Sequence, residues 1–176
     1  MLNTKLIEAL NAQVNKEMFS AYLYMSMSAH CSENNWDGFA KWFMVQYHEE
    51  MFHAMRLYQY LLNQGAEVNL RAIGQPEVKF VSLLDLIEKT YAHEQTITKS
   101  INELYGLAVE NKDYATQIFI SWFVTEQVEE EKNDQEIIAK LKKIQDNSSA
   151  LYLFDQEMGA RALTVSTDFT APLVTV

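Results

Sequence analysis

The hydrophobic residues of the chain recur every three to four positions in four long segments and one short one, which is the spacing of amphipathic α-helices. The long segments cover about residues 4–32, 38–63, 83–110 and, following Asn111 and Asp113, up to about residue 144. The short segment covers about residues 150–163, after Ser148 and Ser149 as candidate caps. The pattern therefore predicts an all-α fold.

The connections indicate how these helices are arranged. Only ENNWD separates the first two, with Asp37 as the expected N-cap of the second, so they should pack antiparallel. The third helix should start after Ser82, which together with Asp85 resembles a capping box, and the fourth follows it closely. The sequence thus predicts two antiparallel helical pairs.

The segment 65–81 between the pairs contains Gly65, Gly74 and Pro76 and shows no helical period. Fully extended, such a linker reaches about 55 Å at 3.3 Å per residue, whereas a helix of this size is roughly 40 Å long. It can therefore cross the whole bundle, so that the second and third helices run parallel. We expect residues 1–163 to form a four-helix bundle with one long crossover loop and a short fifth C-terminal helix. Residues 164–176 are a tail with no assigned role.

Composition supports this fold and limits the partners. The chain is 48% hydrophobic with only 5 Gly and 2 Pro, which favours long helices over a many-turned β fold. Its net charge of -10 disfavours binding to nucleic acid and to acidic membranes. The N-terminal sequence lacks the apolar core of a signal peptide, and no apolar run is long enough to span a membrane. We expect a cytoplasmic protein.

Acidic residues interrupt the apolar face of every long helix near its midpoint: Glu17 in the first, Glu50 with His53 in the second, Glu94 in the third, and Gln127 with Glu130 in the fourth. Ionised carboxylates are too costly in an apolar core unless something compensates their charge. No Lys or Arg falls on these faces at that level, which leaves shared protons or a metal. A single buried glutamate is usually a protonated or water-bridged core residue. Four that converge, with a histidine at Glu-x-x-His spacing, favour metal.

The ligand types indicate which metal. Carboxylates with one imidazole and no thiolate suit iron or manganese better than structural zinc, and they are numerous enough for two ions that share a bridge. The fourth helix offers Gln127-x-x-Glu130 where a symmetric di-iron bundle has a second Glu-x-x-His. One ion would therefore keep a nitrogen ligand from His53, while the other is held by oxygen alone.

A second acidic group, Glu49, Glu126 and Glu129, is rotated by about 100° from Glu50 and Glu130 on the same helices. It is either a solvated acidic face or a feeder or third metal position. The remaining histidines, His30, His48 and His93, are read as surface or supporting residues rather than ligands.

Four segments carry a resemblance to a known family: MLNTKLIEALNAQVNKE at the start, YHEEMFHAMRLYQYL, TYAHEQTITKSINELY and SWFVTEQVEEEK. Over essentially its whole length the chain resembles the bacterial non-haem ferritins. The resemblance implies a ferritin-like fold and an iron storage protein. It further implies a ferroxidase that oxidises Fe2+ with dioxygen and keeps the ferric mineral inside a hollow octahedral cage of 24 like subunits.

The resemblance also implies residue roles. Glu17, Glu50 and His53 would hold one iron of a di-iron centre. Glu50, Glu94 and Glu130 would hold the other, with Gln127 close by. Glu49, Glu126, Glu129 and again Glu130 match a third iron position. Tyr24 matches a tyrosine near the centre, and Trp122 an aromatic residue near it.

Two other interpretations stay open. A bacterioferritin would bind haem, and Met51 stands where its haem-ligating methionine would be. The missing histidine in the fourth helix argues against that subfamily, so we expect no haem. A non-enzymatic metal-binding helical bundle is the contrasting class, and it would bind Fe2+ without consuming oxygen.

Overall fold

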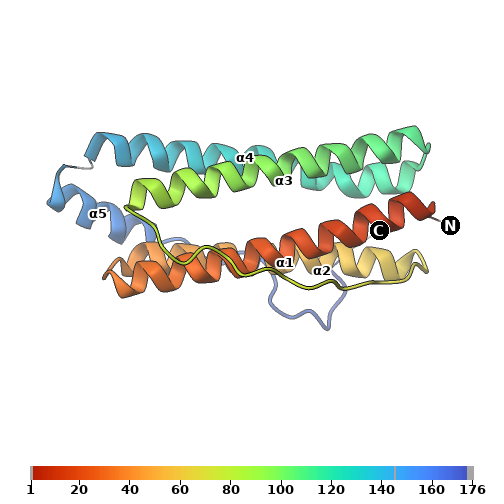
Figure 1. The fold of residues 1–176 in the computed structure, drawn as a ribbon, viewed down its shortest axis with the longest axis horizontal. Coiled ribbons are helices and arrows are strands. Elements are labelled where there is room, and N and C mark those ends of the chain that lie inside the picture. Colours follow the sequence, from red (N-terminus) through yellow and green to blue (C-terminus); the bar gives the residue numbers. More distant parts are fainter. Residues whose placement is uncertain (1, 145, 174–176) are drawn as a thin grey trace.

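The computed structural model describes residues 2–144 and 146–173. Within these residues the chain forms five α-helices and no strand (Figure 1). The helices are α1 (Thr4–Glu33), α2 (Asp37–Asn63), α3 (Leu83–Glu110), α4 (Tyr114–Ile144) and α5 (Ser148–Met158). The predicted all-α fold is confirmed, with a four-helix bundle and a short C-terminal helix.

The long linker crosses the bundle as predicted. Figure 1 shows it returning along the α1 and α2 pair from the end of α2 to the start of α3, so that α2 and α3 run parallel. The linker has no secondary structure to pair its polar backbone groups, and Asn11 of α1 provides a partner for two of them. Asn11 donates to the Glu67 carbonyl at 3.0 Å and accepts from the Asn69 amide at 2.6 Å. These bonds hold the crossover in place.

The start of α2 differs from the prediction, whereas the start of α3 agrees with it. Helix α2 begins at Asp37 itself, with Trp36 at the cap position and no side-chain cap bond. The Asp37 carboxylate lies in the first turn, where the helix dipole favours it. Helix α3 is capped as expected, because Ser82 accepts from the Asp85 amide at 3.1 Å and Asp85 accepts from the Val81 amide at 3.0 Å.

The fifth helix covers Ser148–Met158 rather than residues 150–163. Its cap is Asn147, whose side chain accepts from the Ala150 amide at 3.0 Å, and not Ser148 or Ser149. Asparagine is as good a cap as serine, so composition alone could not place this boundary. Residues beyond the helix, up to 173, form no regular structure. This part of the tail lies against α2, where Gln59 donates to the Ala171 carbonyl at 3.1 Å.

Helix α5 is fixed against the start of α2 by a close backbone approach. A Cβ atom on Gly38 would lie only 1.6 Å from the Asp155 carbonyl oxygen, so this position requires glycine. The Asp155 carboxylate accepts from the Phe39 amide at 3.0 Å, and Lys41 donates to the Gly159 carbonyl at 2.6 Å. These contacts set the position of the chain that leaves α5.

The core consists of two apolar clusters. One includes Leu10, Leu57 and Ile101 and lies on one side of the bundle's midpoint. The other includes Phe43, Ile87, Leu141 and the α5 residue Phe154. The acidic residues of the four long helices lie between these clusters along the sequence of each helix, so apolar packing shields them on both sides.

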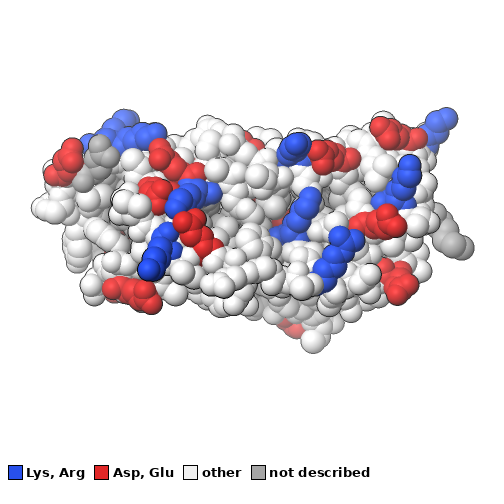
Figure 2. Space-filling model, in the orientation of Figure 1, with Lys and Arg blue, Asp and Glu red and all other residues white. Residues whose placement is uncertain are grey.

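The surface carries charges of both signs. On the face drawn in Figure 2, acidic and basic side chains are interspersed. Several large apolar side chains of α4 and α5 are also exposed: Tyr114, Ile118, Val128, Tyr152 and Leu153. No described helix is long and apolar enough to cross a membrane.

Candidate metal centre

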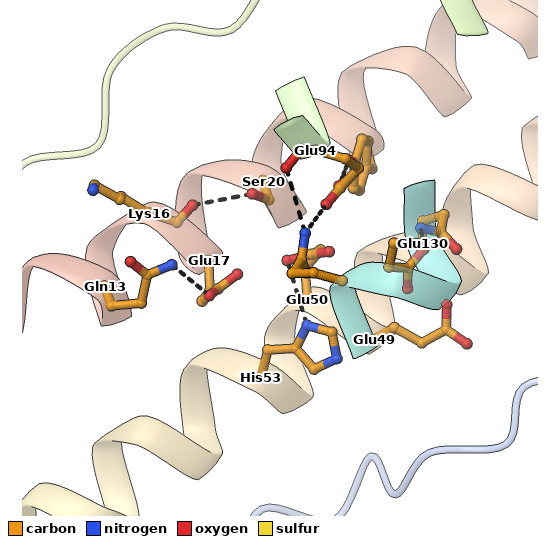
Figure 3. Close-up of polar contacts among 12 residues, drawn as sticks. Gln13, Lys16, Glu17, Ser20, Glu49, Glu50, His53, Glu94 and Glu130 are labelled. Carbon is orange, nitrogen blue, oxygen red and sulfur yellow. Dashed lines mark hydrogen bonds and ion pairs between the residues drawn. The ribbon is translucent and has the colours of Figure 1, made fainter. Parts of the chain in front are cut away.

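Each long helix contributes a buried glutamate to the middle of the bundle (Figure 3). The exposed fraction is 1% for Glu17, Glu50 and Glu94 and 4% for Glu130. Every one interrupts an apolar helix face, and folding therefore removes all four from water together. We call Glu17, Glu50, His53, Glu94, Gln127 and Glu130 the centre.

Glu17, Glu50 and His53 form a compact group that could hold a metal ion, which we call the first position. One ligand atom from each lies within 4.8 Å of the others, and among the described residues no other set of three such side chains is as compact. His53 Nδ1 lies 3.7 Å from Glu50 Oε2. Two buried oxygens in this group, Glu17 Oε2 and Glu50 Oε2, have no hydrogen-bond donor. Oxygens of this kind are acceptors that a cation can satisfy.

Glu94 and Glu130, which with Glu50 make up the second position, are held differently. The Tyr24 hydroxyl donates to Glu94 Oε1, and Gln127 Nε2 donates to Glu94 Oε2 at 2.9 Å. Gln46 Nε2 donates to Glu130 Oε2 at 3.1 Å. Both Glu94 oxygens and one Glu130 oxygen are therefore engaged by protein donors, whereas Glu17 Oε2 and Glu50 Oε2 of the first position are not.

Burial raises the pKa of the carboxyl groups of the centre. It is the main cause for Glu17, for Glu130 and for Glu50, whose pKa rises well above its ordinary value. The pKa of Glu94 is raised to about 8 by burial and next by the charge of Glu130, although hydrogen bonds from Tyr24 and Gln127 oppose this. The metal-free centre therefore holds protons near neutral pH.

His53 is neutral under the same conditions. Burial, and to a smaller degree the charge of Arg56, lowers its pKa to about 3. Its ring packs among aromatic side chains, with the Trp122 ring centroid 5.3 Å away and that of Phe123 5.9 Å away. A neutral imidazole has a lone pair for a metal and needs to lose no proton first.

The second acidic group, which we call the outer cluster (Glu49, Glu126 and Glu129), is not a uniformly solvated face. Glu49 is buried, Glu126 is half-buried and Glu129 is exposed. Burial raises the pKa of Glu49 to about 7; the charge of Arg161 opposes this shift, and the charges of Glu130 and Glu126 add to it. The Arg161 guanidinium donates to Glu49 Oε2 at 2.7 Å.

The other histidines lie outside the centre. His93 Nε2 is 2.8 Å from the Ser20 hydroxyl, and its ring contacts Tyr24 edge to face. His30 packs on Phe80. His93 thus packs beside Tyr24 near the centre, and His30 packs on the linker residue Phe80.

Four polar residues of this region were missed by the sequence reasoning: Gln13, Gln46, Asp134 and Arg161. Gln13 donates to Glu17 Oε1 at 2.7 Å from one turn earlier in α1 (Figure 3). Gln46 and Asp134 precede Glu50 and follow Glu130 by one turn, so helical spacing could have found them. Arg161 lies beyond the end of α5, so helical spacing could not have predicted its position.

Asp134 is a buried carboxyl whose Oδ2 has no hydrogen-bond donor. Burial, followed by the charges of Glu94 and Glu130, raises its pKa from 3.8 to about 9. A raised acid pKa costs stability increasingly as pH rises from the unfolded value toward the folded one. We expect Asp134→Asn to raise the melting temperature of the metal-free protein at pH 7 by roughly 6 °C, which corresponds to about 2 kcal/mol in a chain of this size.

Calorimetry in the presence of a chelator measures this effect, and the increase should be smaller at pH 5. Glu136→Gln removes an exposed acid from the same helix and serves as the control. An increase of equal size at both pH values would contradict a proton-linked cost at Asp134.

Comparisons with known proteins show what the whole chain is similar to. The family model for the ferritin-like domain matches residues 7–144. The bacterial non-heme ferritin of Staphylococcus aureus (strain USA300) is 42% identical over 161 residues, which cover 92% of this chain and 97% of the relative. That of Staphylococcus saprophyticus is 41% identical over 166 residues, covering 94% and 99%. The open pore ferritin of Archaeoglobus fulgidus superimposes with a TM-score of 0.91 at 40% identity, covering 92% of this chain and all of that one.

Proposed function

Because this chain belongs to the ferritin family, we propose that it stores iron, and that it oxidises Fe2+ with dioxygen at the centre before depositing ferric iron inside a hollow homo-oligomeric cage. One observation carries the proposal. A buried glutamate from each of four helices converges with His53, and two carboxylate oxygens there lack any protein donor. Iron is the substrate and the cargo of this reaction.

The two positions would accept the two ions. Glu17, Glu50 and His53 provide oxygen and nitrogen ligands for one Fe2+, and Glu94 and Glu130 provide oxygen ligands for the other, with Glu50 shared. Each Fe2+ gives one electron to dioxygen, which takes up as many protons as electrons. Holding both ions side by side lets two electrons reach one oxygen molecule.

Tyr24 has a positioning role in this proposal. Burial, followed by the charge of Glu94, raises its pKa well above its ordinary value, so its hydroxyl stays protonated and remains a donor. It donates to Glu94 Oε1 and leaves Oε2 to Gln127. Tyr24 would therefore fix the direction in which the Glu94 carboxylate faces an incoming ion.

Assembly into a cage is supported by relatives and by the surface. The matched ferritins are similar over nearly their whole length. Tyr152 and Leu153 on α5, and Ile118 on α4, are large apolar side chains exposed on the isolated chain. Exposed apolar groups of this kind favour contacts between subunits.

Native mass and oxygen uptake test the proposal together. The assembly should have a mass many times that of the 20.4 kDa chain, and Fe2+ addition should consume oxygen rapidly. A non-enzymatic metal-binding bundle would bind Fe2+ without oxygen uptake. A monomeric or dimeric mass would contradict the cage.

The second position should bind iron more weakly than the first. Gln127 is neutral and its amide donates to Glu94 Oε2, so it occupies a potential ligand oxygen and adds no anionic ligand. We expect Gln127→Glu to tighten the second position about tenfold, or 1.4 kcal/mol, and to slow iron turnover after the first burst. Occupancy of each position during an Fe2+ titration measures the difference.

Gln135→Glu adds the same charge on the exposed side of α4 and serves as the control. Equal filling of both positions in the unmodified protein, or unchanged turnover in Gln127→Glu, would contradict this explanation of the fourth helix.

A further inference from the structure

Arg161 brings a positive charge into the acidic residues from outside the four long helices. It lies three residues beyond the end of α5, and its guanidinium donates through Nη2 to Glu49 Oε2 at 2.7 Å. Its Nη1 donates to Gln46 Oε1, and Gln46 in turn donates to Glu130 Oε2 at 3.1 Å. One side chain thus connects the outer cluster to the centre.

We propose that Arg161 is a displaceable counter-ion of the outer cluster, and that a metal cation binds at Glu49 only when the guanidinium leaves it. This inference rests on the proposed function, because the cation is an iron ion beyond the two of the centre. A guanidinium carries only donors and engages the same oxygen lone pairs that a cation needs. The two cations therefore compete for Glu49 Oε2 and repel each other there.

The ion pair between Arg161 and Glu49 is partly buried. The side chain of Arg161 is 24% exposed and that of Glu49 is 11% exposed. The Arg161 guanidinium carbon also lies 5.1 Å from the Trp42 ring centroid, where a cation is favoured. A pair at this depth is worth more than a fully solvated one but is not locked in the core. We expect it to weaken metal binding at the outer cluster about tenfold.

Displacing the guanidinium need not release α5. The helix is held separately by the Asp155 contact with the Phe39 amide and by Lys41 on the Gly159 carbonyl. Lys140 adds an ion pair with Glu157 at 2.6 Å. The Arg161 side chain can therefore swing away while its backbone stays in place. Without the Arg161 guanidinium, the Gln46 side-chain amide would also be free to rotate. Because Gln46 donates to Glu130, this rotation would couple the outer cluster to Glu130.

Titration calorimetry of Co2+ binding to the assembled metal-free protein tests the proposal. In the unmodified protein two tighter binding events should precede a weaker one at the outer cluster. Arg161→Gln should tighten that later event about tenfold and leave the event at the first position, Glu17, Glu50 and His53, unchanged. Lys140→Gln, which removes a neighbouring cation bound to α5 rather than to the acidic residues, should change none of them.

An outer event that is unchanged or weaker in Arg161→Gln would overturn the proposal and leave Arg161 as a structural clamp. If Arg161→Gln does not assemble, Arg161→Lys decides, because a single ammonium cannot bond Glu49 and Gln46 as the guanidinium fork does. Its outer event should be tighter than in the unmodified protein, and equality would overturn the proposal. Absence of the two tighter events in the unmodified protein would instead contradict the proposed function.

Discussion

Replacing Glu50 with alanine is expected to lower the initial rate of Fe2+ oxidation by about a hundredfold or more. Glu50 belongs to the compact group with Glu17 and His53. After burial, the charges of Glu94 and Glu17 raise the pKa of Glu50, so Glu50 interacts with carboxyl groups of both positions. Its loss should therefore weaken both positions and separate the two ions. Stopped-flow absorbance after mixing with aerobic Fe2+ measures the rate.

The variant should still fold and assemble. Truncating Glu50 leaves a small cavity, but it also removes a buried carboxyl that repels Glu17 and Glu94, and these effects oppose each other. Helical content and native mass should therefore change little. Glu103→Ala, an exposed acid on α3, is the control. Undiminished oxidation in Glu50→Ala would place the reaction elsewhere in the molecule.

Metal binding to the centre should strengthen steeply with pH. The pKa of Glu94 is about 8, and burial also raises those of Glu17 and Glu50, so these groups hold protons at neutral pH that a bound cation must displace. His53, with a pKa of about 3, contributes none. Between pH 6 and 7.5 we expect the Co2+ affinity to rise about 30-fold for one displaced proton and about a thousandfold for two.

Calorimetry in two buffers of different ionisation enthalpy counts the protons released on metal binding directly.

The stability of the metal-free protein should show the complementary trend. The folded pKa of Glu94 lies above its ordinary value of 4.5, so the metal-free protein loses stability as pH rises from about 4.5 to 8. Glu94→Gln should release fewer protons on metal binding. An affinity independent of pH, without proton release, would contradict the raised pKa values.

Much of the fold was readable from local pattern. Leu10, Val14 and Glu17 share one helical face because 3.6 residues make a turn, and the same rule put His53 one turn after Glu50. The length of the linker then allowed only a few bundle topologies. Helical spacing therefore predicted that the buried acidic residues and His53 converge, and the resemblance implied the set of Glu17, Glu50 and His53, which the structure brings together.

What the sequence could not provide depends on tertiary contacts. Arg161 meets Glu49 only because Gly38 lets α5 approach α2, and no periodicity links positions so far apart. Helical spacing places Asp134 and Gln46 near the acidic residues, but it does not show whether their side chains donate, accept or lack a hydrogen bond. The difference between Glu94, with both oxygens engaged, and Glu17, with Oε2 free, likewise required side-chain positions.

Anomalous diffraction from crystals soaked briefly with Fe2+ shows where iron binds without relying on activity. We predict one peak among Glu17, Glu50 and His53, and a second, weaker peak bounded by Glu50, Glu94 and Glu130. Any iron at Glu49 should appear later and only where the Arg161 side chain has moved. Iron confined to the surface, with neither position of the centre occupied, would contradict iron binding by the buried glutamates.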